Sequence, residues 1–308
     1  MISDEQQVMV IASKKSAKET VTDFSSHAVL PLSSARVAVR QFGLQEAKDV
    51  DFVAVEEPLE IQLGWLTESG TEHRKLAVTM RTPGQDFELA VGFLFTEGII
   101  NTQDQVAKFE RVLDDANGKT SGNVVRIVLR EQPSIDWSNV ERNFYVSSSC
   151  GVCGKASLDA IKTHTKYSLK DINFHLLSAA VAALPLHLSA LQKVFAGTGG
   201  IHAAALFNQS GVNGEAYEDI GRHNAVDKLI GANYRSRSMP LSEYGMLVSG
   251  RASFELVQKA AMAGCPMLAA VGAPSSLAID LAWETEMTLI GFLRDGRFNV
   301  YTCPSRID

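Results

Sequence analysis

The sequence has little of what marks secreted, membrane-spanning or nucleic-acid-binding proteins. It holds only four cysteines in 308 residues, and their spacing is not that of a small disulfide-stapled domain. It has no excess of positive charge, because 35 acidic residues outnumber 29 basic ones and give a formal net charge of −6. This balance argues against broad binding to nucleic acid or to an anionic membrane. Any anion site must be a local cluster of basic side chains and N–H groups.

Long apolar runs are also missing. The longest, such as residues 177–186, are too short to cross a bilayer. The N-terminus carries Asp4 and Glu5 and lacks the basic start and apolar run of a secretory signal. We therefore expect a cytoplasmic protein with no membrane partner. Thiols stay reduced in that compartment, so a close cysteine pair more often serves chemistry or metal binding than a structural disulfide.

The composition that is present, 45% hydrophobic and 21% charged, is that of a globular protein. We predict four segments. Residues 1–45 form a weakly ordered extension, and residues 46–146 an α+β domain with a hairpin over 58–63 and 75–81, a helix over 87–95 capped by Asp86, and a strand over 124–129. Residues 147–170 form a cysteine-containing loop and linker.

Residues 171–308 alternate between apolar strands and helices, and this domain is predicted to be α/β. The expected strands cover 202–207, 215–217, 244–248, 267–271, 288–292 and 298–302. The expected helices cover 171–184, 189–195, 220–230, 252–263 and 276–285. Such alternation indicates crossover connections and a mixed, largely parallel sheet with helices on its faces.

The loop Cys150-Gly-Val-Cys153 carries the sharpest chemical signal. A thiolate can attack sulfur and hold it as a persulfide if it is exposed and its pKa is lowered. Glycines within and after the pair leave the backbone free to move. Three other interpretations stay open: half of a zinc site, a thioredoxin-type redox pair, and a loop without catalytic function. Cys265 and Cys303 are isolated and offer no second pair.

Three predicted strand-to-helix turns favour an anion site at one sheet edge, where helix N-termini present unpaired N–H groups. The turns supply Arg222 and His223, then Ser249, Gly250 and Arg251, and then Gly272 and Ser275. Their glycines would allow a phosphate to approach, and the arginines would donate to it. The alternative is ordinary helix capping with surface arginines.

Two histidines are further candidates. His202 begins an apolar strand and is either a hydrogen-bonded core residue or part of the anion site. His223 and Asp227 are four residues apart on one helix and can meet, and Asp219 can cap that helix or orient His223. A general acid–base role for His223 is therefore one possibility.

Five longer motifs carry a resemblance to a known family. They are Phe93-Leu-Phe-Thr-Glu-Gly-Ile-Ile, the Cys150-Gly-Val-Cys153-Gly loop, Thr198-Gly-Gly-Ile-His202-Ala-Ala-Ala, residues 218–231 and residues 249–259. In order over about residues 36–306, they resemble the formate dehydrogenase accessory sulfurtransferases called FdhD.

The resemblance implies a function and further site residues. Members take sulfane sulfur from a cysteine desulfurase and pass it to the molybdenum bis-guanine-dinucleotide cofactor, which formate dehydrogenase needs in sulfurated form. Cys150 would carry the persulfide with Cys153 as its partner. The family's cofactor-binding segment corresponds to Phe292, Leu293, Arg294, Asp295, Gly296 and Arg297.

The resemblance also implies a cytidine deaminase-like α/β/α fold for residues 171–308. The helix starts that hold zinc in deaminases carry Arg222-His223 and Gly250-Arg251 here, so we expect neither zinc nor deamination. The expected partners are a cysteine desulfurase, the formate dehydrogenase apoprotein and a second copy of the chain in a homodimer. The alternative function is a chaperone that delivers the nucleotide cofactor, with a structural cysteine pair.

Overall fold

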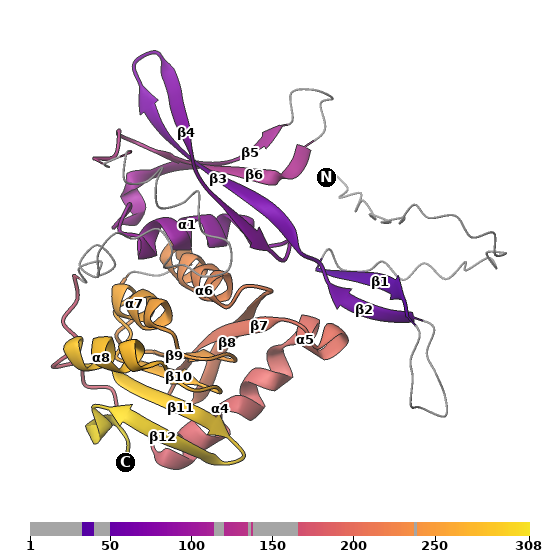
Figure 1. The fold of residues 1–308 in the computed structure, drawn as a ribbon. Helices are drawn as coiled ribbons and strands as arrows, with labels where there is room; N and C mark the ends of the chain where they lie inside the picture. Colours follow the sequence, from indigo (N-terminus) through magenta and orange to yellow (C-terminus); the bar gives the residue numbers. More distant parts are fainter. Residues whose placement is uncertain (1–32, 40–49, 114–119, 135–136, 138–165, 237–238) are drawn as a thin grey trace.

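Two β-sheets and the helices packed between them form the body of the molecule (Figure 1). The computed structural model describes residues 33–39, 50–113, 120–134, 137, 166–236 and 239–308. In this part of the chain no helix has the length and apolar character needed to span a bilayer.

The smaller sheet has the strand order β4-β3-β6-β5. Its strands are β3 (Glu57–Thr67), β4 (Gly70–Arg81), β5 (Val106–Leu113) and β6 (Thr120–Leu129). The antiparallel β3–β4 hairpin was predicted and is confirmed, while β3 and β6 run parallel. Alternate residues of β3, from Leu59 to Trp65, are buried because successive side chains point to opposite faces of a sheet.

Helix α1 (Asp86–Thr96) packs in this same hydrophobic core. The expected helix is therefore present, but its N-cap is Gln85 rather than Asp86. Asp86 lies in the first turn, where its buried carboxylate pairs with Arg81 at 2.9 Å. A carboxylate in the first turn stabilises a helix without capping it.

The larger sheet has the strand order β12-β11-β10-β9-β7-β8. Its strands are β7 (His202–Asn208), β8 (Gly211–Asp219), β9 (Gly245–Val248), β10 (Met267–Ala270), β11 (Thr288–Arg294) and β12 (Arg297–Thr302). The chain is thus mixed α/β. The prediction of a largely parallel sheet is wrong, because only the β9–β10 and β10–β11 pairs are parallel. The β7–β8 and β11–β12 hairpins and the β7–β9 pair are antiparallel.

Helices cover both faces of this sheet (Figure 1). Helices α6 (Arg222–Ser236), α7 (Phe254–Met262) and α8 (Ser276–Glu284) share one core with the smaller sheet. Helix α4 (Ser178–Leu191) covers the opposite face, and α5 (Lys193–Thr198) follows it. Helix was also expected over 171–177. There the chain instead pairs with its own C-terminus, where Leu176 bridges Ile307.

Helices α1 and α6 cross at two glycines. A Cβ on Gly92 would lie 1.9 Å from the carbonyl oxygen of Asp227, and one on Gly231 would lie 1.8 Å from that of Glu88. The two backbones are therefore in direct contact, and one core runs from the smaller sheet through both helices to the larger sheet. The predicted linker over 147–170 lies mostly outside the described residues, so the division of the chain into domains stays a prediction.

A two-stranded antiparallel ribbon extends from this body (Figure 1). It consists of β1 (Ser34–Ala38) and β2 (Val50–Ala54). Two 3-10 turns, η1 (Gln103–Gln105) and η2 (Pro304–Arg306), complete the described structure.

Candidate functional site

One edge of the larger sheet collects the residues that the helix starts had indicated. Strands β9, β10 and β11 end at this edge, and β7 begins there because it runs antiparallel to β9. His202, at the start of β7, pairs with Asp219, at the end of β8. A Cβ built on Gly250 would lie 3.2 Å from Nδ1 of His202 and 4.0 Å from Cβ of Arg222. The first and second predicted turns therefore meet around His202.

The environment of His202 is positively charged. Burial lowers the pKa of this half-buried imidazole, and the charges of Arg222, His223 and Arg251 lower it further, against the opposing effect of Asp219. Positive charge close to an imidazole disfavours its protonation. We define the four residues His202, Arg222, His223 and Arg251 as the basic edge.

Arg222 has a buried polar atom, Nε, that lacks a hydrogen-bond partner in the described structure. A buried N–H donor without a partner is costly, and the great majority in native proteins are paired. An anion bound at the start of α6 would supply the missing acceptor.

His223 is paired with a carboxylate from another helix. Its Nε2 lies 2.7 Å from Oε2 of Glu255 in α7 and 3.4 Å from Oγ of Ser253. The hydrogen bond from His223 holds the pKa of Glu255 below its usual value, against the effect of burial. The expected meeting of His223 with Asp227 is wrong, because Asp227 faces the core and accepts two hydrogen bonds from Lys259, at 2.8 and 2.9 Å.

The two candidate serines have structural partners. Ser249 Oγ accepts a hydrogen bond of 2.9 Å from the N–H of Ala203 and so ties the second turn to β7. Ser275 is the N-cap of α8, and its Oγ accepts from the N–H of Ala278. Both hydroxyl groups can still donate, but their first role is to fix the turns.

The glycines of the turns are needed for packing between protein groups. A Cβ on Gly272 would lie 3.0 Å from Cα of Arg251 and 3.0 Å from the carbonyl oxygen of Gly250. The Gly272 N–H donates to that same oxygen at 2.9 Å. Because these glycines have no side chains, the second and third turns can pack against each other. We had expected the glycines to leave room for a phosphate instead.

The segment 292–297 forms the β11–β12 hairpin beside this edge. Its turn residues Asp295 and Gly296 have φ values of 54° and 71°, a conformation that Asp-Gly pairs adopt readily in tight hairpins. The N–H of Phe292 donates to the carbonyl of Gly272 at 3.0 Å, so the hairpin is attached to the third turn. Leu293 is fully buried, which leaves only its backbone able to contact a ligand.

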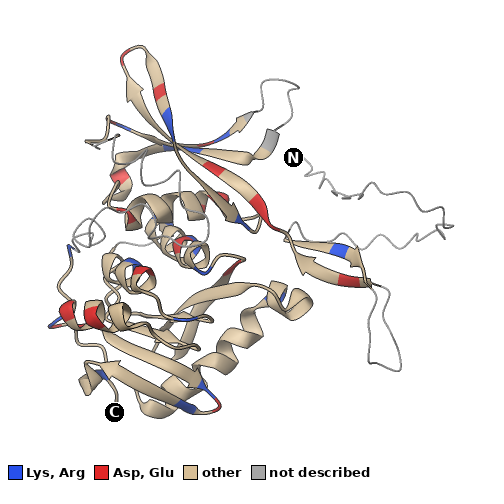
Figure 2. Cartoon of the chain, viewed as in Figure 1, with Lys and Arg blue, Asp and Glu red and all other residues tan. Residues whose placement is uncertain are grey.

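A cavity of about 260 Å³ opens on the hairpin. Its lining residues are Phe292, Arg294, Arg297, Phe298 and Asn299. Arg294 and Arg297 face each other in the strand register, and Figure 2 shows positive charge at the tip of this hairpin. An aromatic ring beside two guanidinium groups is suited to a nucleotide, which offers a base to stack and phosphates to bind.

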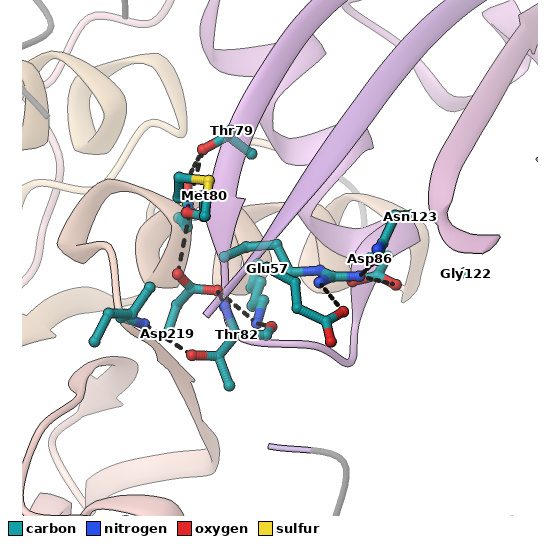
Figure 3. A network of polar contacts seen from close by, with 12 residues as sticks. Glu57, Thr79, Met80, Thr82, Asp86, Gly122, Asn123 and Asp219 are labelled. Atoms are coloured by element: carbon teal, nitrogen blue, oxygen red, sulfur yellow. Dashed lines mark hydrogen bonds and ion pairs between the residues drawn. The ribbon is translucent and has the colours of Figure 1, made fainter. Parts of the chain in front are cut away.

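A buried polar network holds the basic edge in place (Figure 3). Asp219 is fully buried and lies 2.7 Å from Nζ of Lys228, and it accepts from the N–H groups of Thr82 and Gly221. Lys228 also donates to the carbonyl of Thr82 at 2.9 Å. This network joins the end of β4 to the turn that begins α6, and so it positions Arg222.

Sequence reasoning missed the roles of Lys228 and Glu255. A signal for Lys228 was available in the sequence, since a lysine placed among apolar residues such as Leu229 and Ile230 is rarely buried unless it is paired. No local pattern could have found Glu255, because it reaches His223 across the interface between two helices.

Two of the four cysteines can be assessed. Burial raises the pKa of Cys265 to about 12, and it also raises the pKa of the partly exposed Cys303. Neither is therefore a thiolate near neutral pH. Cys150 and Cys153 lie outside the described residues.

The same fold occurs in a solved structure from Desulfotalea psychrophila, described as a formate dehydrogenase accessory protein. The two agree with a TM-score of 0.66 at 22% sequence identity, over 90% of this chain and 100% of that one. The molecule is thus a mixed α/β protein that shares the fold of this structure, and its basic edge is suited to an anion.

Sequence comparison places the chain more narrowly. The model of the FdhD/NarQ family matches residues 54–308. Proteins named sulfur carrier protein FdhD are similar as well: that of Streptomyces avermitilis is 49% identical over 83% of this chain and 89% of its own. That of Nocardia farcinica is 43% identical over 90% of this chain and 95% of its own. The chain belongs to the FdhD/NarQ family.

Proposed function

We propose that this protein is a sulfur carrier that accepts sulfane sulfur from a cysteine desulfurase and transfers it to the molybdenum bis-guanine-dinucleotide cofactor of formate dehydrogenase. The observation that carries the proposal is the basic edge, where Arg222 Nε is buried without a partner in the described structure beside His202. Such an edge fits the phosphates of a nucleotide cofactor. The relatives named as sulfur carriers support the sulfur chemistry.

Cys150 is proposed as the carrier. Its thiolate attacks the outer sulfur of the donor persulfide, a new S–S bond forms, and the donor leaves as a thiolate. The high pKa of Cys265 supports this assignment, because a thiol that stays protonated is a poor nucleophile. The reaction is proposed to occur in the cytoplasm, where thiols stay reduced.

The cofactor is proposed to lie along the sheet edge, as a substrate of the transfer. Phe292, Arg294 and Arg297 would hold a guanine nucleotide in the hairpin cavity. Arg222 and Arg251 would bind phosphate oxygens, while Glu255 keeps His223 oriented. Cys153 would either accept the sulfur from Cys150 or release it as hydrosulfide by forming the Cys150–Cys153 disulfide.

The test is mass spectrometry after incubation with a cysteine desulfurase and cysteine. Wild type should gain the mass of one or more sulfur atoms and lose it on reduction, and Cys150→Ala should gain none. Cys303→Ala is the matched control and should behave as wild type. Persulfide on Cys150→Ala would refute the carrier assignment, and no added sulfur on wild type would favour a cofactor-delivery chaperone.

A further inference from the structure

Two ion pairs join α6 to α7, one turn apart on each helix. His223 and Asp227 are four residues apart on α6, as Glu255 and Lys259 are on α7, and such residues share one helix face. In the outer pair Nε2 of His223 lies 2.7 Å from Oε2 of Glu255. In the inner pair, which is more deeply buried, Nζ of Lys259 lies 2.8 Å from Oδ1 of Asp227. We call these four residues the charge ladder.

The inner pair is complete in itself. Lys259 donates to both oxygens of Asp227, and Thr96 Oγ1 donates to Oδ1 at 2.9 Å. Its effect on the outer pair is electrostatic. The hydrogen bond from His223 lowers the pKa of Glu255 most, and the charge of Lys259 lowers it further, against the effect of burial. Glu255 is therefore a carboxylate at neutral pH.

The outer pair leaves one ring nitrogen of His223 available. A carboxylate can only accept hydrogen bonds, so Nε2 carries a proton and donates it to Glu255. Ser253 Oγ lies 3.4 Å from the same nitrogen. Nδ1 has no hydrogen-bond partner among the described residues. Since the bond made by one ring nitrogen determines the state of the other, Nδ1 is the atom of this pair that can exchange a proton with a ligand.

A counter-ion distinguishes His223 from the arginines of the basic edge. Arg222 and Arg251 form no ion pair with a described residue, so their charges are available to phosphate. The charge of a protonated His223 is balanced by Glu255 instead. A carboxylate placed in this way orients an imidazole and stabilises the imidazolium, which is what proton transfer requires.

We infer that His223 is a catalytic residue of the sulfur transfer, which donates a proton from Nδ1 to the oxygen displaced from the acceptor, and that Glu255 is its positioning residue. The inference rests on the proposed function, because the acceptor is the molybdenum cofactor lying along the sheet edge. It adds the proton donor that this transfer needs.

The step begins with the hydrosulfide released when the Cys150–Cys153 disulfide forms. The two thiols supply the two electrons that reduce the sulfane sulfur, so no other reductant is needed. Hydrosulfide then replaces an oxo ligand of molybdenum: a molybdenum–sulfur bond forms and the molybdenum–oxygen bond breaks. The oxygen leaves as water with one proton from hydrosulfide and one from Nδ1. His223 is left neutral and regains its proton from solvent.

The experiment follows a single turnover of sulfur from radiolabelled Cys150 persulfide on the full chain to the unsulfurated cofactor. His223→Gln should load sulfur and release hydrosulfide as wild type does, but should sulfurate the cofactor about 100- to 10,000-fold more slowly, the contribution of a general acid. Added imidazole should restore part of this rate by replacing the missing ring. His73→Gln is the matched control, since His73 is exposed in β4, and it should behave as wild type.

Glu255→Gln separates positioning from a structural role. It should also slow the transfer, because an amide can donate to Nε2 and so favour the wrong tautomer. Imidazole should not restore its rate, since the ring of His223 is still in place. The double variant His223→Gln/Glu255→Gln should be no slower than His223→Gln, because residues that act as a unit are not additive.

Transfer by His223→Gln at the wild-type rate, or a slow transfer that imidazole does not restore, would overturn the inference and leave the proposed carrier standing. Failure of the wild type to load sulfur on Cys150 would overturn the carrier instead. Free hydrosulfide would then replace the persulfide as the sulfur source, and the same difference between wild type and His223→Gln should be seen. Its absence in that experiment would also overturn the role of His223.

Discussion

Two groups of basic side chains in this molecule differ in whether a carboxylate neutralises them. Arg81, Lys228 and Lys259 are buried, and each lies within 3.0 Å of an aspartate oxygen. At the sheet edge, Arg222, Arg251, Arg294 and Arg297 form no ion pair with another described residue. We call the first group the buried clamp.

The difference indicates what each group is for. Desolvated charges are tolerated in the clamp because every one has a counter-ion and further hydrogen bonds. The cations at the edge have no such counter-ions, and after burial, which is the largest cause, their charges lower the pKa of His202 further. The fold keeps this unfavourable arrangement at the place where an anionic ligand would relieve it, while the clamp holds the edge to the smaller sheet.

The largest effect is expected from breaking the clamp with Lys228→Met, which leaves Asp219 fully buried without its counter-ion. Removal of one partner of a buried pair costs about 3–5 kcal/mol of unfolding free energy, measurable by urea denaturation. Lys75→Met is the matched control, since its pair with Glu60 is partly exposed and should contribute about 1 kcal/mol or less. Equal losses of unfolding free energy in the two variants would show that the buried ion pair contributes no more to stability than the partly exposed one.

A smaller loss is expected from Gly92→Ala, which tests the crossing of α1 and α6. The new methyl group would lie 1.9 Å from a backbone oxygen of α6, so the helices must separate. Overpacking of this kind costs about 1–3 kcal/mol or more. Gly197→Ala in α5 has no atom within 4 Å and should be neutral or slightly stabilising. Thermal unfolding of both variants makes the comparison, and an unchanged Gly92→Ala would contradict the close crossing.

The clamp and the edge also differ in how far the sequence predicts them. The β3–β4 hairpin, α6, α7 and the strands from β7 to β12 were all expected, because their apolar periodicity and turn residues are local signals. That the strand-to-helix turns share one sheet edge was expected too, from the general rule that parallel strands end at one edge, but their meeting around His202 was not.

The pairing of charges was not predictable in the same way. Spacing of four residues on a helix put Asp227 beside His223, but tertiary packing turned Asp227 toward Lys259 and brought Glu255 in from α7. Strand direction in the larger sheet was also misjudged. The hairpins at both ends and the β7–β9 pair are antiparallel, so the sheet has fewer parallel pairs than the alternating pattern indicated.

Arg222→Ala should separate binding from stability. Its Nε has no partner in the described structure, so its loss should change the unfolding free energy by about 0.5 kcal/mol or less. GDP affinity should fall by about 10- to 100-fold if the guanidinium donates to a phosphate, since a charged hydrogen bond contributes roughly 1.5–3 kcal/mol. Lys108→Ala, in the smaller sheet and paired with Glu110, is the control and should leave GDP affinity unchanged. A large loss of unfolding free energy without a loss of GDP affinity would show that Arg222 has a structural role, like the residues of the buried clamp.

The smallest effect concerns pH and His202. Its pKa in the folded protein lies below the ordinary 6.5, through burial and through neighbouring positive charge, above all that of Arg222. The unfolded chain therefore binds this proton first, so the contribution of His202 to stability is complete above pH 6.5 and is lost as pH falls through the folded pKa. Between pH 7.5 and 5.5 the wild type should lose more unfolding free energy than His202→Gln. Glu255 does not contribute to the change between pH 7.5 and 5.5, because its pKa is held below 4.5.

Added sulfate, whose charge is constant over this range, tests the cause of the effect. It should reduce the difference in unfolding free energy between wild type and His202→Gln, because it occupies the basic edge and favours the protonated imidazole. Identical pH profiles for wild type and His202→Gln would mean that the edge does not act on His202 as a cluster of like charges.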